Sequence, residues 1–319
     1  MSRLWPWLRL LAGLAVLAAL LRHFGAGPFA EAWRVTTSQA VVAGFVLTAC
    51  STLTSAWRWR VVARSLGVPL SVRESVAAYY RSQFLNAVLP GGILGDADRA
   101  VRHGRAAGDL GAGVRATVWD RVVGQVVQVA LAVLALLLLP TPWRGSGVGA
   151  VAVLTLLATA AAAVVVVRRR TGGWVGRDLR ALARPAVSSR LVVASCGSTA
   201  GHLAVFAVAA SLVGVDASAA VLVTTGLIVL VGSAIPLSVA GWGPREGVTA
   251  WAFGVVGLGA AAGLTVAVVY GVLAGVATLP GAWVLVADVA ARRRLHVLAP
   301  EPRAVPEPVA LLPVEVIGA

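Results

Sequence analysis

The chain has 319 residues, of which 59% are hydrophobic and only 13% are charged, and its mean hydropathy is +0.87. A soluble domain needs a far more polar surface, so this composition excludes one and indicates an all-α polytopic membrane protein. The formal net charge of +14 comes from 27 basic residues, all of them arginine, against 13 acidic residues.

Apolar runs occur along nearly the whole chain and approach the roughly 20 residues that a helix needs to cross the hydrocarbon core. They predict about eight transmembrane helices, including a short crossing at 247–257. The topology closes only if the stretch 74–94 enters the membrane and returns to the same side as a re-entrant segment. The longer apolar runs are 8–21, 40–56, 122–139, 147–167, 191–213, 219–235 and 264–287.

The arginines form clusters that flank the apolar runs. This distribution is typical of cytoplasmic loops that face anionic lipid, and it argues against nucleic acid as the partner. It predicts a multi-pass protein of the plasma membrane with both termini in the cytoplasm. The clusters are Arg58, Arg60, Arg64 and Arg73; Arg99, Arg102, Arg105 and Arg115; Arg168 to Arg170 with Arg177, Arg180, Arg184 and Arg190; and Arg292 to Arg294.

A first break in the apolar pattern lies at 85–105, which reads LNAVLPGGILGDADRAVRHGR. Pro90 removes a helix hydrogen-bond donor, and the glycines 91, 92 and 95 allow backbone conformations that other residues avoid. Irregular backbone survives at membrane depth only inside protein or beside a polar cavity. The break therefore predicts such a cavity.

A polar stripe opens the apolar run at 122–139. Asp120, Gly124 and Gln128 recur every four residues and so share one helix face, and Arg121 follows Asp120 directly. A charge at the centre of a membrane helix costs roughly 2.5 to 3.5 kcal/mol on insertion scales, so these charges need partners. We expect the stripe to face protein or water; the alternative is that its charges extend to the membrane boundary.

A second break lies in the other half of the chain at 235–248, which reads IPLSVAGWGPREGV. Prolines and glycines interrupt an apolar run there, and Arg245 and Glu246 are set directly into it. Paired Gly/Pro-interrupted segments in the two halves of a transporter are the best sequence indication of a substrate site. We expect the two breaks to wall one polar cavity; the alternative is that both are ordinary cytosolic turns.

Three further side chains within apolar runs are interpreted as structural. Cys50 and Cys196 have no CxxC partner and no neighbouring histidine, so neither a metal nor a redox cofactor is expected. His202 lies beside small residues that permit close helix packing, and a buried, hydrogen-bonded histidine is preferred over a proton relay. At the end of the chain, the proline-rich stretch 295–319 predicts a disordered cytosolic tail after a transmembrane domain at 1–294.

Three ordered motifs make the chain resemble the transmembrane region of lysylphosphatidylglycerol synthases, a flippase-like integral membrane family. The motifs are QFLNAVLPGGILGDADR at 83–99, DRVVG at 120–124 and PLSVAGWGPREG at 236–247. The resemblance extends to about Arg294. Bifunctional members of the family carry their aminoacyl-transferase in a further cytosolic domain, so only the lipid-translocating half of the synthase activity is expected to apply to this chain. It implies that the headgroup cavity is formed by Asn86, Asp96, Arg99, Asp120, Arg121, Ser238, Arg245 and Glu246, and the helix breaks by Pro90, Gly91, Gly92, Gly95, Pro236, Gly241 and Gly243.

The arginines of this cavity could receive a phosphate, because guanidinium donors match phosphate oxygens in paired geometry. The expected function is therefore translocation of a charged-headgroup lipid, either a phospholipid or a polyprenyl-phosphate-linked lipid. Two alternatives stay open. One is a membrane glycosyl- or phospho-transferase that acts on a lipid phosphate, suggested by the Asp96-x-Asp98 pair. The other is a non-transporting partner of a separate lipid or cell-envelope synthase.

Overall fold

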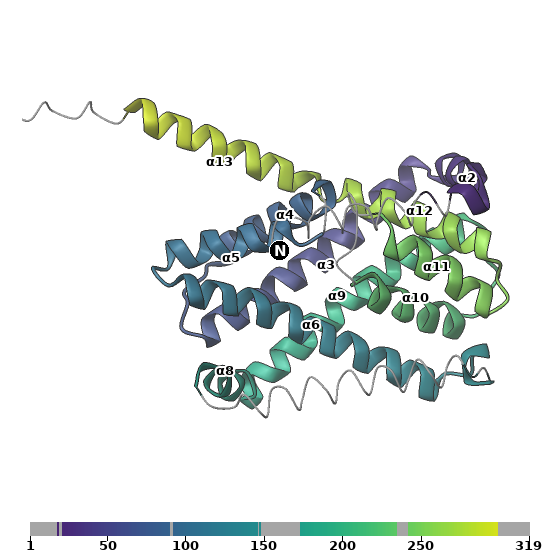
Figure 1. Cartoon of the computed structure of the whole chain (residues 1–319), viewed down its shortest axis with the longest axis horizontal. Helices are drawn as coiled ribbons and strands as arrows, with labels where there is room; N and C mark the ends of the chain where they lie inside the picture. Colours follow the sequence, from purple (N-terminus) through teal and green to yellow (C-terminus); the bar gives the residue numbers. More distant parts are fainter. Residues whose placement is uncertain are drawn as a thin grey trace, which may run out of the picture. The chain divides into compact units, whose positions relative to one another are not determined.

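A computed structural model describes residues 18, 21–89, 92–145, 147, 173–234 and 242–298, and all regular elements in these ranges are helices (Figure 1). They are α2 (Gly27–Val35), α3 (Ser38–Ser65), α4 (Val72–Val88), α5 (Leu94–Ala106), α6 (Leu110–Leu138), the 3-10 turn η1 (Pro142–Gly145), α8 (Trp174–Leu182), α9 (Pro185–Leu212), α10 (Ala219–Ser233), α11 (Pro244–Val255), α12 (Ala260–Val276) and α13 (Leu279–Leu298).

Several predicted features fall outside the described residues. They include nearly all of the runs 8–21 and 147–167, the tail from 299 onward, and the site residues Pro90, Gly91, Pro236, Ser238 and Gly241. The chain divides into two units, Met1–Val284 and Leu285–Ala319. The described part of the second unit is the continuation of α13 to Leu298, so 295–298 is helical.

Four of the predicted spans are confirmed by helices that are long and apolar enough to cross a membrane. They are Ser38–Ser65, Leu110–Leu138, Pro185–Leu212 and Ala260–Ala290. α10 is apolar but has only 15 residues, fewer than the roughly 20 that a perpendicular crossing needs. The last stretch is interrupted between α12 and α13, just ahead of Pro280, which cannot donate a helix hydrogen bond. The number of eight spans is therefore not confirmed within the described ranges.

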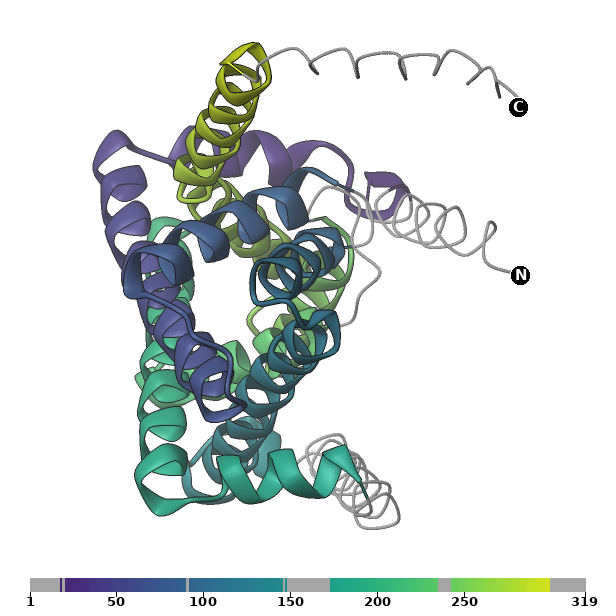
Figure 2. The ribbon, with the colours of Figure 1, turned by 90° about the vertical axis from the view of Figure 1, so that its left-hand side faces the viewer.

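α3 and α9 pack side by side and antiparallel through small residues (Figures 1 and 2). The Ser51 hydroxyl donates to the carbonyl oxygen of Ser198 at 2.9 Å. A Cβ atom placed on Gly201 would lie 2.8 Å from that of Ser51, and one on Gly197 would lie 3.1 Å from the methyl group of Thr54. Small residues thus let the two backbones approach closely, as in other membrane helix pairs. The pairing brings the end of α3 beside the start of α9.

α4 and α5 form a helical hairpin around the first break. α4 begins at a capping box in which Ser71 and Glu74 exchange hydrogen bonds between side chain and backbone, at 2.9 and 3.2 Å. The chain leaves α4 at Leu89 and enters α5 at Leu94, and Gly92 between them has a φ of +63°, which favours glycine. This hairpin covers the stretch predicted to be re-entrant, and its depth in the membrane stays a prediction.

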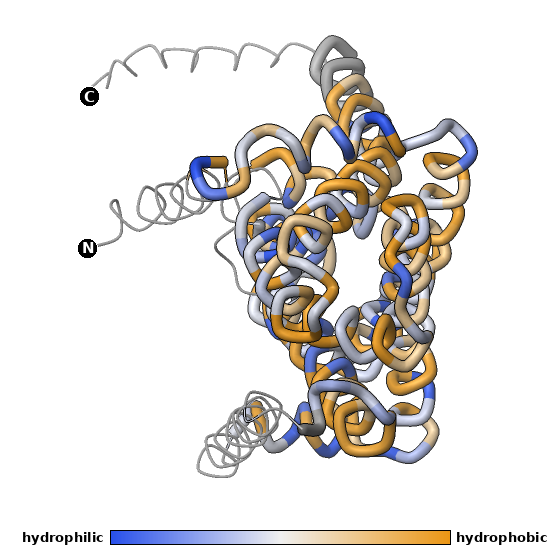
Figure 3. Tube along the Cα trace, turned by 90° about the vertical axis from the view of Figure 1, so that its right-hand side faces the viewer, coloured by the Kyte–Doolittle hydropathy of each residue, from blue (hydrophilic) through white to orange (hydrophobic). Residues whose placement is uncertain are grey.

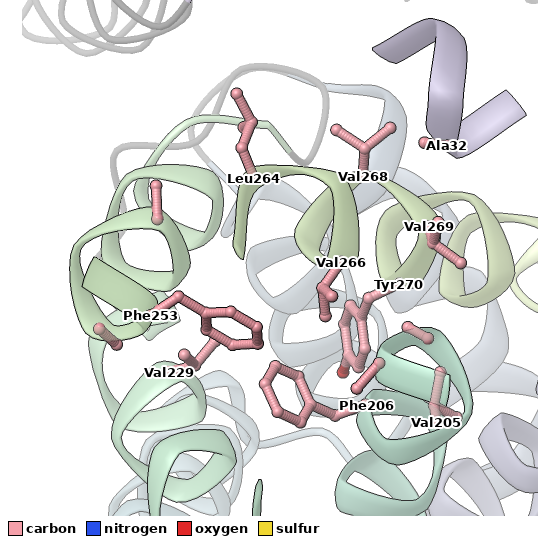
Figure 4. Close-up of a cluster of buried hydrophobic side chains, with 14 of the residues drawn as sticks. Ala32, Val205, Phe206, Val229, Phe253, Leu264, Val266, Val268, Val269 and Tyr270 are labelled. Atoms are coloured by element: carbon pink, nitrogen blue, oxygen red, sulfur yellow. The ribbon is translucent and has the colours of Figure 1, made fainter. Parts of the chain in front are cut away.

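Apolar side chains fill the interior and also cover much of the outside. In the interior, Phe206 of α9 meets Phe253 of α11 edge to face, with ring centroids 6.2 Å apart, and Val229, Val266 and Tyr270 pack around them (Figure 4). Hydrophobic residues dominate most of the helical trace (Figure 3). Outward-facing apolar side chains are expected where the solvent is lipid rather than water. Exposed examples are Val46 and Leu53 on α3 and Val192 and Val193 on α9.

Candidate functional site

Asp120 of α6 is fully buried and joins four helices. Its Oδ1 accepts a hydrogen bond from Nε of Arg58 on α3 at 2.8 Å. Its Oδ2 accepts from Nη2 of Arg99 on α5 at 3.1 Å and from the hydroxyl of Tyr79 on α4 at 3.4 Å. Gly124, one turn along α6, leaves the space that the Arg58 guanidinium occupies. The predicted stripe of Asp120 and Gly124 therefore faces protein.

The interpretation of Arg58 as a cytoplasmic-loop arginine is wrong. α3 continues as a helix to Ser65, and the Arg58 side chain points inward to Asp120 with only 8% of its surface exposed. A guanidinium tolerates this burial because a carboxylate compensates its charge.

Arg99 lies inside this network and is not among the lining residues of the cavity at Arg121. Its guanidinium is sandwiched between the rings of Trp59 and Tyr79, whose centroids lie 4.5 and 4.4 Å from Cζ. Its Nη2 is shared between Asp96 and Asp120, at 3.1 Å from each. The side chain is only 1% exposed. Arg99, which the resemblance assigned to the headgroup cavity, is therefore placed to link the two aspartates, and cation–π contacts with the two rings add to its stabilisation.

Asp96 collects donors from three helices. Its Oδ1 accepts from the Ser82 hydroxyl at 2.9 Å, and its Oδ2 accepts from Nδ2 of Asn86 at 3.3 Å and from Nη2 of Arg121. The Asn86 side-chain oxygen also accepts from the backbone N–H of Gly95 at 2.8 Å. Asn86 thus fixes the first turn of α5 and orients the Asp96 carboxylate at the same time.

These contacts form an ionic ladder, which we define as Arg58, Asp120, Arg99, Asp96 and Arg121 in that order. Charges alternate along it, and three arginines against two aspartates leave one surplus positive charge. The first four side chains are at most 13% exposed, whereas that of Arg121 is 57% exposed. The surplus charge is therefore most accessible at Arg121.

A cavity of about 540 Å³ opens at Arg121. Its polar lining comes from Asp96, Thr117, Arg121 and Ser233. Most of the remaining wall is apolar, including Val118 of α6. Cavities of this size hold small molecules or lipid headgroups. Gly92 of the first break and Ala234, at the end of the helix that leads into the second break, both line it.

The two other charged residues predicted for the site form a separate pair at the start of α11. Nε and Nη2 of Arg245 donate to Oε1 of Glu246 at 3.0 and 2.6 Å, and Oε2 of Glu246 accepts from the backbone N–H of Gly243 at 2.6 Å. Glu246 is fully buried. Gly243 has a φ of +127°, which favours glycine at this turn. Gly271 of α12 leaves room for the Arg245 guanidinium.

A smaller cavity of about 190 Å³ lies beside Arg245, and its walls include Phe206, Val229 and Tyr270 (Figure 4). Ser233 lines both this cavity and the larger one at Arg121. The charged residues of the two breaks are therefore not in one ion-pair network among the described residues, and their two cavities have the lining residue Ser233 in common.

His202 is hydrogen-bonded, as predicted: its Nδ1 lies 2.9 Å from the hydroxyl of Tyr270. Tyr270→Phe is expected to reduce the free energy of unfolding by about 1 to 3 kcal/mol, because the histidine nitrogen loses its partner. The measurement is reversible unfolding in mixed micelles. Tyr80→Phe is the matched control, since no hydrogen bond of its hydroxyl is seen within the described ranges, and an equal loss in both variants would contradict the expectation.

The Asp96-x-Asp98 pair is not arranged as a shared metal site. Asp98 accepts from Nη2 of Arg81 at 2.9 Å, while Asp96 belongs to the ionic ladder. Within the part of the chain that the structure describes, no group of three or more histidine, cysteine, aspartate or glutamate residues could hold a metal ion.

An all-helical integral membrane protein with an ion-paired interior and a charged cavity is the class that these features define. The family model of the lysylphosphatidylglycerol synthase transmembrane region matches residues 7–281, and the chain belongs to that family, as its motifs predicted. The comparisons with curated proteins and with solved structures gave no match.

Proposed function

We propose that the protein translocates a lipid with a charged, phosphate-bearing headgroup between the leaflets of the plasma membrane, through the cavity at Arg121. The observation that carries this proposal is the surplus positive charge of the ionic ladder, which is exposed in a cavity with largely apolar walls. An exposed guanidinium in low-dielectric surroundings favours an anion, and its forked donors match two phosphate oxygens. A lipid phosphate is the anion that the membrane itself supplies.

A headgroup that leaves water must exchange its hydration for polar contacts, or it meets the large cost of an ion in low dielectric. Arg121 offers such donors in the larger cavity, and the hydroxyls of Thr117 and Ser233, which donate to backbone carbonyl oxygens of their own helices, can still accept a hydrogen bond there. Asp96 compensates Arg121 when the cavity is empty, and it can meet a cationic group of the headgroup when the phosphate is bound. The acyl chains would stay in lipid while only the headgroup passes.

Ser233 lines both cavities, and in this proposal the headgroup passes from the cavity at Arg121 along Ser233 to the one at Arg245. The second cavity offers a further cation and the Tyr270 ring. In this proposal the two arginines bind the phosphate in succession.

Arg121→Gln is expected to slow translocation of a fluorescent anionic phospholipid in proteoliposomes by about 10- to 100-fold, because a charge-assisted hydrogen bond contributes about 1.5 to 3 kcal/mol. The stability of the purified protein should change little, since the Arg121 side chain is 57% exposed. Arg105→Gln, at an exposed arginine of α5, removes the same charge away from the cavity and should leave transport unchanged.

Unchanged transport in Arg121→Gln would end the proposal. Absence of transport by the wild-type protein, together with stoichiometric co-purification of an envelope enzyme, would instead favour the non-transporting partner. Metal-dependent turnover of a lipid-linked donor by the pure protein would favour the transferase.

A further inference from the structure

A third arginine-lined cavity lies where the end of α3 meets the start of α9. Its volume is about 330 Å³. Three guanidinium groups line it, and no acidic side chain is among its described lining residues. The lining includes Trp57, Arg60, Arg64, Ser65, Val187 and Arg190.

No described acidic side chain pairs with the three arginines of this cavity. Nε of Arg60 donates to the backbone oxygen of Leu70 at 3.0 Å, which satisfies a donor but adds no negative charge. Arg64 and Arg190 are exposed, and neither makes a hydrogen bond or ion pair within the described ranges. Three like charges around one hollow repel each other, so the hollow attracts an anion.

This cavity lies at the level where both helices change from apolar to basic. On α3, the exposed residues run from Leu53 through Trp57 to Arg64. On the antiparallel α9, exposed Arg190 is followed by exposed Val192 and Val193. At a rise of about 1.5 Å per residue, Trp57 and Arg64 lie roughly 10 Å apart along the helix axis, which is enough to span one interfacial region of roughly 5 to 8 Å. Tryptophan prefers this boundary, and lipid phosphates lie there.

We propose that this cavity binds the phosphate group of an anionic phospholipid, as a fixed lipid site distinct from the cavity at Arg121. Basic pockets between helices at the membrane surface recognise anionic headgroups through their guanidinium donors. The exposed apolar side chains of α3 and α9 offer the acyl chains a surface directly beside the arginines. The same chemistry would accept free phosphate, but only a lipid uses both the cationic and the apolar part.

The test is native mass spectrometry of the purified full chain in detergent, titrated with phosphatidylglycerol. Arg64→Gln/Arg190→Gln is expected to weaken the tightest phosphatidylglycerol adduct by about tenfold or more. Arg73→Gln/Arg177→Gln is the matched control, because both arginines are exposed on other helices and the loss of charge is the same. Phosphatidylcholine, which has the phosphate but no net charge, should bind more weakly to wild type.

Two further measurements separate the possible outcomes. Arg64→Lys/Arg190→Lys keeps the charge and should retain part of the binding. Gel filtration of the glutamine variant checks that its loss of binding is not caused by misfolding. Thermal unfolding with inorganic phosphate, against chloride at equal ionic strength, tests the soluble source, and no difference between the salts is expected. Equal phosphatidylglycerol adducts in wild type and the glutamine variant would overturn the proposal. The proposal would also be overturned, in favour of a free-phosphate site, if inorganic phosphate stabilised the wild-type protein but not the glutamine variant.

Discussion

Asp120→Asn is expected to lower the free energy of unfolding by about 3 to 5 kcal/mol, because it leaves Arg58 and Arg99 buried without the carboxylate between them. The asparagine retains the size of the side chain and one oxygen acceptor, so the effect reports the loss of charge. The measurement is reversible unfolding of the purified protein in mixed micelles.

Asp98→Asn is the matched control for this prediction. Asp98 also pairs with an arginine, but its side chain is 29% exposed, and partly exposed pairs typically contribute up to about 1 kcal/mol. The double variant Arg58→Met/Asp120→Leu removes one charge of each sign, so it should be more stable than Asp120→Leu alone, which leaves Arg58 buried without a carboxylate. Equal losses in Asp98→Asn and Asp120→Asn would show that the ionic ladder has no special role in stability.

From the sequence, the acidic residue Asp120 of the ionic ladder is easier to predict than the arginine that pairs with it. Asp120 stands out because it is a charge at the mouth of a strongly apolar run, and helix periodicity predicts which face it occupies. Its partner Arg58 lies 62 residues away in a cluster of arginines that resembles a loop. The sequence feature that could have indicated this pairing is that Trp57, Arg58 and Trp59 continue a helix-compatible pattern. Three consecutive residues of a helix point in different directions, so at least one of these side chains faces the protein interior.

The aromatic partners of Arg99 are not predictable from the sequence for a related reason. Tyr79 and Trp59 hold Arg99 from both sides, but neither differs in sequence from an ordinary interfacial aromatic. Cation–π contacts depend on where separate helices meet, which periodicity does not encode. The positions of the two breaks were predictable, since proline and glycine act locally. The number of spans was not, because α10 is short and the apolar stretch Ala260–Ala290 is interrupted.

Gly95→Ala is expected to destabilise the protein by about 1 to 3 kcal/mol or more, because α4 and α5 touch at this glycine. A Cβ atom there would lie 2.0 Å from the backbone oxygen of Ser82 and 2.9 Å from the side-chain oxygen of Asn86. The backbone of one helix must therefore move. Alanine gains up to about 1 kcal/mol of helix propensity over glycine, so the net loss measures how strongly the clash outweighs that gain.

The same substitution should also impair transport, because the hydrogen bonds that orient Asp96 come from Ser82 and Asn86, the two residues that the new methyl group displaces. The measurements are unfolding in mixed micelles and lipid translocation in proteoliposomes. Gly275→Ala in α12 is the matched control, since a Cβ atom there has no neighbour within 4 Å. It should be neutral or stabilising by up to about 1 kcal/mol. If Gly95→Ala had the same stability and transport as Gly275→Ala, the hairpin would not require the close contact at Gly95. The position of Asp96 next to Arg121 would then be determined by the ion pairs alone.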